Sequence, residues 1–251
     1  MHMPKTVVVI PTYNEADNLP RITAALFELG MDELEILVVD DASPDGTGQV
    51  ADQLSQQHAG RFHVMHRPGK LGMGTAYVQG FQEALDYEAQ TIIHMDADFS
   101  HPVSAIPEFI KLIPDYDVVV GSRYIKGGRL DERWSAFRRL LSWWANSVWV
   151  RLILGTKTHD ATAGFKCWKA EALRNIGLER IRSNGYIFQV EMCYLAEKLG
   201  YRIKEIPIYF AERSQGQSKM GTRIQIEAAL RVFEIRLRYH NLHASGSYVR
   251  E

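Results

Sequence analysis

The fold is decided by residues 91–102, whose sequence is TIIHMDADFSHP. Its first five residues are mostly apolar, as in a buried strand, and Pro102 ends that strand. Asp96 and Asp98 follow directly, so in a parallel sheet they lie beyond the carboxyl end of the strand, where open α/β sheets bind ligands. Side chains at i and i+2 of an extended segment point the same way, so both carboxylates can contact one divalent cation. A solvated Asp-x-Asp turn is the alternative.

Strands and helices alternate on both sides of this stretch. Apolar, β-branched runs predict further buried strands at residues 6–10 (TVVVI), 35–39 (EILVV), 62–66 (FHVMH) and 117–121 (DVVVG). We expect helices between them, ending near residue 29 and over 47–57 and 75–87, then helices at 134–155, 186–200 and 222–240 and a strand at 201–208. This rhythm predicts an α/β fold with a parallel sheet and right-handed crossovers.

Charge is divided unevenly along the 251 residues. Residues 1–120 carry 6 Lys and Arg against 18 Asp and Glu, whereas residues 121–251 carry 23 against 12. An acidic half suits a metal site, and a basic half suits a phosphate-bearing ligand or an anionic membrane. Two solvated faces are the alternative. No recognition-helix, zinc or RNA-binding signature appears, so no nucleic-acid partner is expected.

Several features bear on the cellular setting. Cys167 and Cys193 lack metal-ligand spacing and are expected to be reduced, buried thiols of a cytosolic protein. No leader and no uncharged apolar stretch of 18 residues is apparent, so we expect no transmembrane helix. Residues 134–155 hold four tryptophans and three arginines, which favours a helix at a membrane interface. A core helix with an aromatic face is the alternative.

Three loops are candidate site loops. Residues 67–74 (RPGKLGMG) lack the spacing of phosphate-binding and dinucleotide-binding loops, but Lys70 could reach a phosphate; a plain turn is the alternative. Residues 159–166 (HDATAGFK) combine a polar start with a glycine, and residues 213–219 (RSQGQSK) form a basic loop that we expect to be mobile.

Taken together, seven short motifs resemble the family 2 glycosyltransferases, and within them the dolichol-phosphate (polyprenol-phosphate) mannosyltransferases. They span about residues 6–220 and read PTYNE (11–15), VDDASPD (39–45), KLG (70–72), DADFSHP (96–102), GSRY (121–124), DATAGFK (160–166) and Arg213 with Ser218-Lys219. The resemblance implies a GT-A-type, Rossmann-like domain over residues 1–220, with an open, mostly parallel sheet flanked by helices. Residues 221–251 would add an amphipathic helix and a flexible tail, without forming a separate domain.

The resemblance also implies roles for individual residues. Asp96 and Asp98 would hold Mg²⁺ or Mn²⁺ on the donor diphosphate, with Ser100 at a position where some relatives have a glutamine ligand. Asp96, Asp98, Arg123 and Asp160 are the expected catalytic residues, although Asp160 could orient the metal shell, orient the acceptor or serve as a structural cap. The donor would contact Pro11, Tyr13, Glu15, Val39, Asp41, Lys70, Ala97, Arg213 and Lys219, and the acceptor phosphate would contact Arg123, Arg138 and Ser142.

The implied activity is metal-dependent, inverting transfer of mannose from GDP-mannose to a polyprenyl or dolichyl phosphate, giving polyprenyl-phosphate-mannose and GDP. The chain would act in the cytoplasm, on the cytosolic face of a membrane, bound peripherally or through a small membrane-anchoring protein. One alternative is a glucosyltransferase that uses UDP-glucose, and another is a non-catalytic nucleotide-sugar-binding module. An aspartate-based phosphatase is a weaker alternative, because its motif would follow the first strand rather than the fourth.

Overall fold

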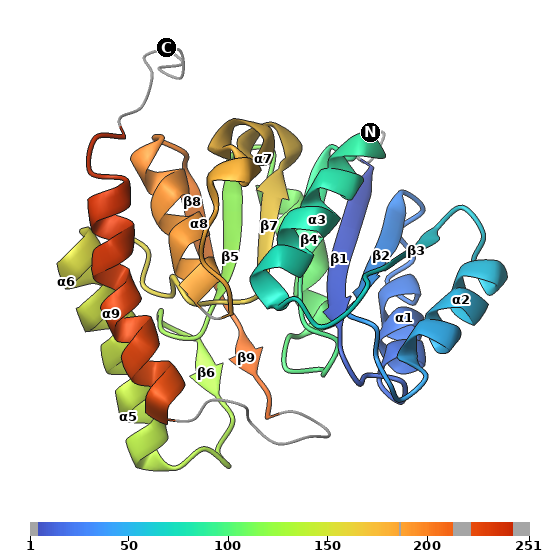
Figure 1. Cartoon of the computed structure of the whole chain (residues 1–251), viewed down its shortest axis with the longest axis horizontal. Helices are drawn as coiled ribbons and strands as arrows, with labels where there is room; N and C mark the ends of the chain where they lie inside the picture. The colour runs from blue at the N-terminus through green and yellow to red at the C-terminus, as the bar shows by residue number, and fades with distance from the viewer. Residues whose placement is uncertain (1–4, 186, 213–221, 243–251) are drawn as a thin grey trace.

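A seven-stranded sheet lies between two layers of helices (Figure 1). The computed structural model describes residues 5–185, 187–212 and 222–242, with only the backbone for residues 222–228. The strand order is β3-β2-β1-β4-β7-β5-β8. These strands are β1 (Thr6–Thr12), β2 (Leu34–Asp40), β3 (Phe62–His66), β4 (Thr91–His94), β5 (Val118–Ser122), β7 (Lys166–Lys169) and β8 (Ile203–Pro207). A separate, short parallel pair consists of β6 (Arg129–Leu130) and β9 (Tyr209–Phe210).

The helices connect and cover these strands. They are α1 (Leu19–Phe27), α2 (Thr47–Gln57), α3 (Met73–Asp86), α4 (Ile106–Leu112), α5 (Ala136–Trp144), α6 (Arg151–Leu154), α7 (Ala170–Ile176), α8 (Ile187–Lys198) and α9 (Thr222–Arg238). Short 3₁₀ turns occur at Val103–Ala105 and Leu178–Arg180. The predicted helix over residues 134–155 is present, but the π-helical turn Ala145–Val150 separates α5 from α6.

The sheet is mostly parallel, which confirms the predicted fold class. The exception is β7, which runs antiparallel between β4 and β5. No strand is predicted here, because Lys166 falls at the end of the 159–166 segment, which is expected to be a loop. Its sequence, KCWK, places a lysine at a fully buried position, so it lacks the apolar run typical of a buried strand.

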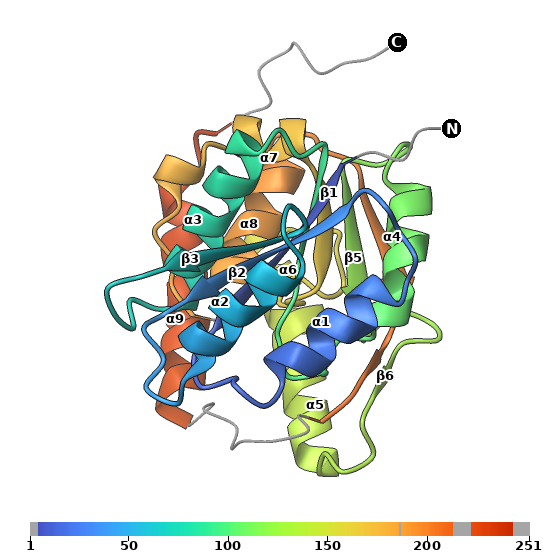
Figure 2. The same ribbon diagram turned by 90° about the vertical axis from the view of Figure 1, so that its right-hand side faces the viewer.

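Alternating side chains divide the core into two clusters, one on each face of the sheet. On one face, Val7 and Val9 of β1 pack with α3, α7 and α8. On the other face, Val8 and Ile10 pack with α1, α2 and α4. Figure 2 shows α3, α8 and α9 on one side of the strands and α1 and α4 on the other. Val232 and Ile235 of α9 and Tyr239, which follows it, are buried in the first cluster, so this helix shares the core of the sheet.

Helices α5, α6 and α9 lie together at one end of the sheet, where α9 contacts α6 and the π-helical turn (Figure 1). Ser135 caps α5 by accepting a hydrogen bond from the backbone N–H of Arg138, and Gly155 ends α6 in a left-handed conformation. In the part of the chain that the structure describes, no helix combines the length and the hydrophobicity needed to cross a bilayer.

Candidate active site

Three loops at the carboxyl edge of the sheet share an uncommon backbone conformation. Asn14 follows β1, Ala42 follows β2 and Phe99 follows β4, with φ angles of 63°, 52° and 60°. The left-handed region costs a residue other than glycine roughly 1–2 kcal/mol and concentrates at functional sites. These turns point to a site at the edge where the sequence places Asp96 and Asp98.

Both aspartates are held by specific hydrogen bonds. The Tyr77 hydroxyl donates to Asp96 Oδ1 over 3.1 Å, and Asp98 Oδ1 accepts from the backbone N–H of Ser100 over 3.0 Å. Burial raises the pKa of Tyr77 well above its usual value and the charge of Asp96 raises it further, so this phenol keeps its proton and donates it. Tyr77 lies on α3 and was not predicted, because nothing in the sequence places that helix against the aspartates.

The oxygen atoms of this edge fit a divalent cation. Ser100 is buried, and its Oγ has no hydrogen-bond partner among the described residues, although buried hydroxyls nearly always have one. Asp96, Asp98 and Ser100 together offer hard oxygen donors of the kind that Mg²⁺ and Mn²⁺ prefer. Ala97, which separates the two aspartates in the sequence, is buried. The donor set therefore fits the predicted metal.

His101 supports the motif from beneath. The backbone N–H of Asp96 donates to His101 Nδ1 over 3.1 Å, and the imidazole stacks on Phe165 with ring centroids 5.2 Å apart. Burial lowers the pKa of His101 to about 4, so the ring is a neutral acceptor. A Cβ at Gly164 would lie only 3.3 Å from His101 Cε1. The 159–166 loop therefore packs directly against the Asp-x-Asp motif.

Predicted donor residues meet after β1, β2 and β3. The Lys70 ammonium lies over the Tyr13 ring, 3.8 Å from its centroid. Asp41 forms an ion pair with the buried guanidinium of Arg67 and accepts a hydrogen bond from the Gly72 backbone N–H over 3.3 Å. Sequence reasoning gave Arg67 no role, because only the fold shows that it reaches Asp41.

The remaining donor residues are placed less directly. Pro11 and Val39 are paired neighbours at the carboxyl ends of β1 and β2, but the Val39 side chain is buried against Gly80 of α3. The Val39 side chain therefore belongs to the core, and it does not face this edge as a ligand-binding side chain would. Glu15 Oε2 accepts a hydrogen bond from Asn18 Nδ2 over 2.8 Å. Arg213 and Lys219 lie outside the described residues.

Arg123 and Asp160 form a buried ion pair. Arg123 donates from Nε to Asp160 Oδ2 over 2.7 Å and from Nη2 to Asp160 Oδ1 over 2.6 Å, and Nη2 also donates to Thr162 Oγ1. Burial alone would lower the pKa of Arg123, but the charge of Asp160 outweighs it and raises the pKa above its usual value. Asp160 thus fixes the orientation of Arg123. Nε and Nη2, two of the guanidinium nitrogens expected to bind a phosphate, already donate hydrogen bonds within the protein.

The structure brings Ser142 to this pair. Its hydroxyl lies 2.5 Å from the Tyr124 hydroxyl, and Asn146 joins the Ser142 carbonyl to the backbone N–H of Thr162. Arg138 has different partners, because its guanidinium lies 3.6 Å from the Trp134 ring centroid and 3.7 Å from Glu212 Oε1. The three predicted acceptor residues therefore fall into two contact sets.

A buried lysine supports the 159–166 loop from the core. Lys166 Nζ donates to the carbonyl oxygens of Ala161 and Ala163, and to Gln189 Oε1 over 2.9 Å. Burial lowers the pKa of Lys166 to about 8. No sequence pattern predicted this role, because a lysine in a motif is more readily interpreted as a ligand than as a core residue.

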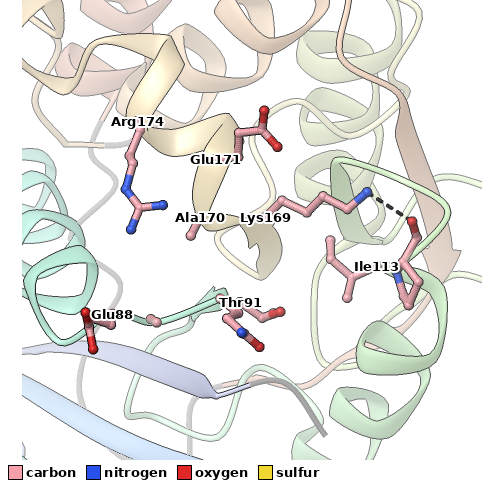
Figure 3. Close-up of a pocket in the computed structure, with 10 residues that line it drawn as sticks. Glu88, Thr91, Ile113, Lys169, Ala170, Glu171 and Arg174 are labelled. Carbon is pink, nitrogen blue, oxygen red and sulfur yellow. Dashed lines mark hydrogen bonds between the residues drawn. The ribbon is translucent and has the colours of Figure 1, made fainter. Parts of the chain in front are cut away.

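A pocket of about 480 Å³ lies elsewhere, at the amino end of β4 (Figure 3). Thr91, Lys169, Glu171 and Arg174 are among its lining residues. The Lys169 ammonium donates to the Pro114 carbonyl over 3.0 Å. The pocket contains none of the predicted site residues, and it opens at the edge opposite Asp96 and Asp98.

Comparison with known proteins agrees with the motifs and the site. Residues 7–177 match the family Glycosyl transferase family 2. The chain is 41% identical over 228 residues to an undecaprenyl-phosphate mannosyltransferase of Micrococcus luteus, covering 91% of this chain and 92% of the relative. It is also 41% identical over 232 residues to a polyprenol monophosphomannose synthase of Mycolicibacterium smegmatis, covering 92% and 86%. The chain therefore belongs to glycosyl transferase family 2 and is a glycosyltransferase. The resemblance to polyprenol-phosphate mannosyltransferases is confirmed.

Solved structures share the fold. A mannosyltransferase from Pyrobaculum calidifontis in complex with GDP-Man and Mn²⁺ superposes with a TM-score of 0.64 at 18% identity, over 95% of this chain and 65% of that one. Glucosyl-3-phosphoglycerate synthase from Mycobacterium tuberculosis, in complex with Mg²⁺ and UDP, gives 0.65 at 16% identity, over 97% and 82%. These likenesses establish the GT-A-type fold.

Proposed function

We propose that this chain transfers mannose from GDP-mannose to a polyprenyl phosphate, with inversion at the anomeric carbon and with Mg²⁺ or Mn²⁺ as cofactor. The observation that carries the proposal is the Asp96-Ala97-Asp98 motif at the carboxyl end of β4, beside the buried Ser100 hydroxyl that lacks a described partner. Support for the sugar and the acceptor comes from the two relatives at 41% identity, whose names specify mannosyl transfer to polyprenyl phosphates.

The donor would lie across the loops after β1, β2, β3 and β4. Tyr13 and Lys70 would contact the nucleotide end, and Asp96, Asp98 and Ser100 would hold the cation at the diphosphate. When bound, the cation offsets the negative charge that develops on the departing nucleoside diphosphate. Tyr77 and His101 keep Asp96 in place through its Oδ1 atom and its backbone N–H.

The acceptor would be oriented from the basic half. Its phosphate is largely ionised near neutral pH, because the second pKa of a phosphate monoester is about 6, so the attacking oxygen needs no general base. That oxygen forms a bond to the anomeric carbon as the bond from this carbon to the GDP oxygen breaks, and GDP leaves. Arg123, fixed by Asp160, and Arg138 would bring the two anions together despite their repulsion.

Exposed apolar side chains on neighbouring helices support peripheral membrane binding. Helix α9 contacts α6 and the π-helical turn that continues α5, and Arg138, Arg139 and Arg231 accompany the apolar residues of α5 and α9. An apolar face with flanking arginines suits an anionic membrane surface, here the cytosolic face that presents the lipid acceptor. The exposed apolar side chains are Phe137, Leu140, Leu141, Trp143, Trp144, Leu152, Leu230, Phe233 and Leu237. A small membrane-anchoring protein that covers the same face is the second possibility.

Vesicle sedimentation tests the membrane contact. We expect co-sedimentation with vesicles that contain anionic lipid, and we expect it to weaken as salt rises, because salt screens charge attraction. Binding that resists both high salt and alkaline washing would contradict a peripheral contact.

A product assay tests the activity. Purified protein is incubated with Mg²⁺ and a polyprenyl phosphate, together with either GDP-mannose or UDP-glucose, and the free nucleotide and the glycolipid are measured. We expect acceptor-dependent release of GDP and formation of the mannolipid, both abolished by a chelator. Preference for UDP-glucose would overturn the donor assignment. Binding without turnover would indicate a nucleotide-sugar-binding module, and release of inorganic phosphate would indicate a phosphatase.

A further inference from the structure

The glycine-rich loop of residues 67–74 is held by a residue far away in the sequence. Asn184 Oδ1 accepts a hydrogen bond from the backbone N–H of Gly74 over 2.9 Å, and Asn184 Nδ2 donates to the Leu71 carbonyl over 3.1 Å. One side chain therefore satisfies a backbone donor and a backbone acceptor of the same loop. Such a paired contact fixes the course of the loop more firmly than a single hydrogen bond.

Close approach between the two segments accounts for two of the glycines. A Cβ at Gly72, where φ is 102°, would overlap the Asn184 side chain, and a Cβ at Gly74 would lie 2.7 Å from the Ser183 carbonyl oxygen. Glycine at position 74 lets the two backbones approach, and glycine at position 72 leaves room for the Asn184 side chain. The loop is thus shaped by residues 183–185, which is a different reason from cradling a phosphate or making a plain turn.

The other side of the loop is fixed by Arg67. Its buried guanidinium pairs with Asp41, and its Nη2 donates to Thr75 Oγ1 over 2.6 Å. In the sequence, Lys70 lies between Arg67 and Leu71, which Asn184 holds, and its ammonium lies over the Tyr13 ring. The position of Lys70 therefore depends on a loop that is fastened at both ends.

Asn184 is itself anchored through a buried carboxylate. Glu191 of α8 is fully buried and accepts hydrogen bonds from the backbone N–H of Ser183 over 2.7 Å and of Arg182 over 3.2 Å. It also accepts from the Tyr239 hydroxyl over 2.6 Å and from Arg238 Nη1 over 3.0 Å. The segment that carries Asn184 is thereby tied to both α8 and α9.

We propose that Asn184 is a positioning residue of the donor site, which holds Leu71 and Gly74 so that Lys70 stays over Tyr13 and meets the nucleotide sugar. The inference rests on the proposed function, because that function places the donor at Lys70. Asn184 acts through Lys70 and does not touch the reacting atoms. Its role is thus separate from those of Asp96 and Asp98, which hold the cation.

The first test compares donor and acceptor parameters. In Asn184→Ala, we expect the Kd for GDP-mannose, measured by calorimetry, and the donor KM to rise about tenfold, because two hydrogen bonds that fix the loop are lost. The acceptor KM should stay at the wild-type value. Asn241→Ala, at an exposed position after α9, is the matched control and should change neither. Equal effects on donor and acceptor would overturn the proposal.

A double-mutant cycle tests whether Asn184 acts through Lys70. We expect Asn184→Ala to weaken donor binding in the wild-type background but to add little in the Lys70→Ala background, because coupled residues are not additive. The same loss in both backgrounds would overturn the proposal. If Asn184→Ala fails to fold, Asn184→Ser enters the same cycle, because its hydroxyl keeps the side chain polar, and the expectation is the same with a smaller effect.

The outcomes separate this inference from the proposed function. If wild-type protein and Asn184→Ala bind GDP-mannose with equal affinity, the role of Asn184 is overturned and the proposed function stands. If wild-type protein binds UDP-glucose and not GDP-mannose, the proposed donor is overturned. The double-mutant cycle, measured with UDP-glucose, then tests Asn184 by the same criterion. Wild-type protein that binds neither nucleotide sugar removes both.

Discussion

The two halves of the chain build their parts of the site in different ways. In residues 1–120, with 6 basic and 18 acidic residues, Asp96 and Asp98 follow β4 and accept hydrogen bonds from uncharged donors, the Tyr77 hydroxyl and the backbone N–H of Ser100. In residues 121–251, with 23 basic and 12 acidic residues, Arg123 also follows a strand, β5, but its partner is a charged side chain. There, Arg123 is held by Asp160, which is 37 positions away, and Tyr124 by Ser142, which is 18 away.

This difference shows that the net charge of a region does not give the charge offered to a ligand. Asp96 and Asp98 receive hydrogen bonds that orient them and leave their negative charge in place. Arg123, by contrast, is neutralised by a buried carboxylate. For the proposed acceptor phosphate, the positions of the arginines should therefore matter more than their number. Four predictions test this comparison.

The largest effect is expected in the acidic half. Asp98→Ala should lower turnover by about a thousandfold, because it removes a ligand of a cation that contributes several kcal/mol to charge stabilisation. The melting temperature should change by only a few degrees, because Asp98 stands at a strand end outside the apolar core. Asp52→Ala, at an exposed aspartate of α2, is the control and should retain activity. Near-normal transfer by Asp98→Ala in metal-free buffer would contradict the assigned role.

The buried ion pair of the basic half should matter first for stability. Asp160→Asn leaves the Arg123 charge buried without its counter-charge, so the free energy of unfolding should fall by about 3 kcal/mol. The acceptor KM should rise because Arg123 loses its orientation, whereas GDP-mannose affinity should hold. Denaturant unfolding and two-substrate kinetics measure both effects. Glu108→Gln breaks an exposed pair with Lys111 and should change neither; a similar loss there would argue against a special role for the buried pair.

Arg138 should affect the acceptor with little effect on stability, because its side chain is 40% exposed. Arg138→Ala should weaken apparent acceptor affinity about tenfold, the lower end for a hydrogen bond to a charged group. Arg138→Lys should recover part of this, since an ammonium lacks the planar fork that lies on Trp134. Arg174→Ala, at an exposed arginine of α7 near the opposite edge of the sheet, is the control. A tenfold loss of donor affinity with acceptor dependence unchanged would show that the halves are assigned wrongly.

The effect on activity is expected to be smallest at the buried cation of Lys166, whose pKa is lowered to about 8 by burial. Between pH 8 and about 10.4, the unfolded chain keeps a proton that the folded chain releases. The free energy of unfolding should therefore rise with pH in this window relative to Lys166→Met, by at most about 1.4 kcal/mol per pH unit. Below pH 8 the difference should be constant. Denaturant unfolding of both proteins from pH 7 to 10 measures it, and parallel curves would contradict the lowered pKa.

The apolar pattern of the sequence was enough to predict six of the seven strands of the sheet and the position of the Asp-x-Asp motif, but not β7. The runs at β1, β2, β4 and β5 are apolar and β-branched because both faces of these strands are buried. The residue that follows such a run must stand at an edge of the sheet, so the place of Asp96 followed from local pattern alone. Tyr13 and Lys70 each follow a predicted strand, so the sequence places both at this edge of the sheet, although it does not predict their contact.

Only the tertiary structure decided which groups engage each other. In the folded chain, β7 lies antiparallel between β4 and β5, and Arg123 forms an ion pair with Asp160. Lys166 is buried under its own loop, and Asn184 accepts a hydrogen bond from Gly74, which is 110 positions away in the sequence. Local pattern reports how deeply a segment is buried and with what period, but it carries no record of the partner. The partner is set when distant segments pack, because a buried charge or backbone amide must then find its hydrogen bonds among whatever groups the packing supplies.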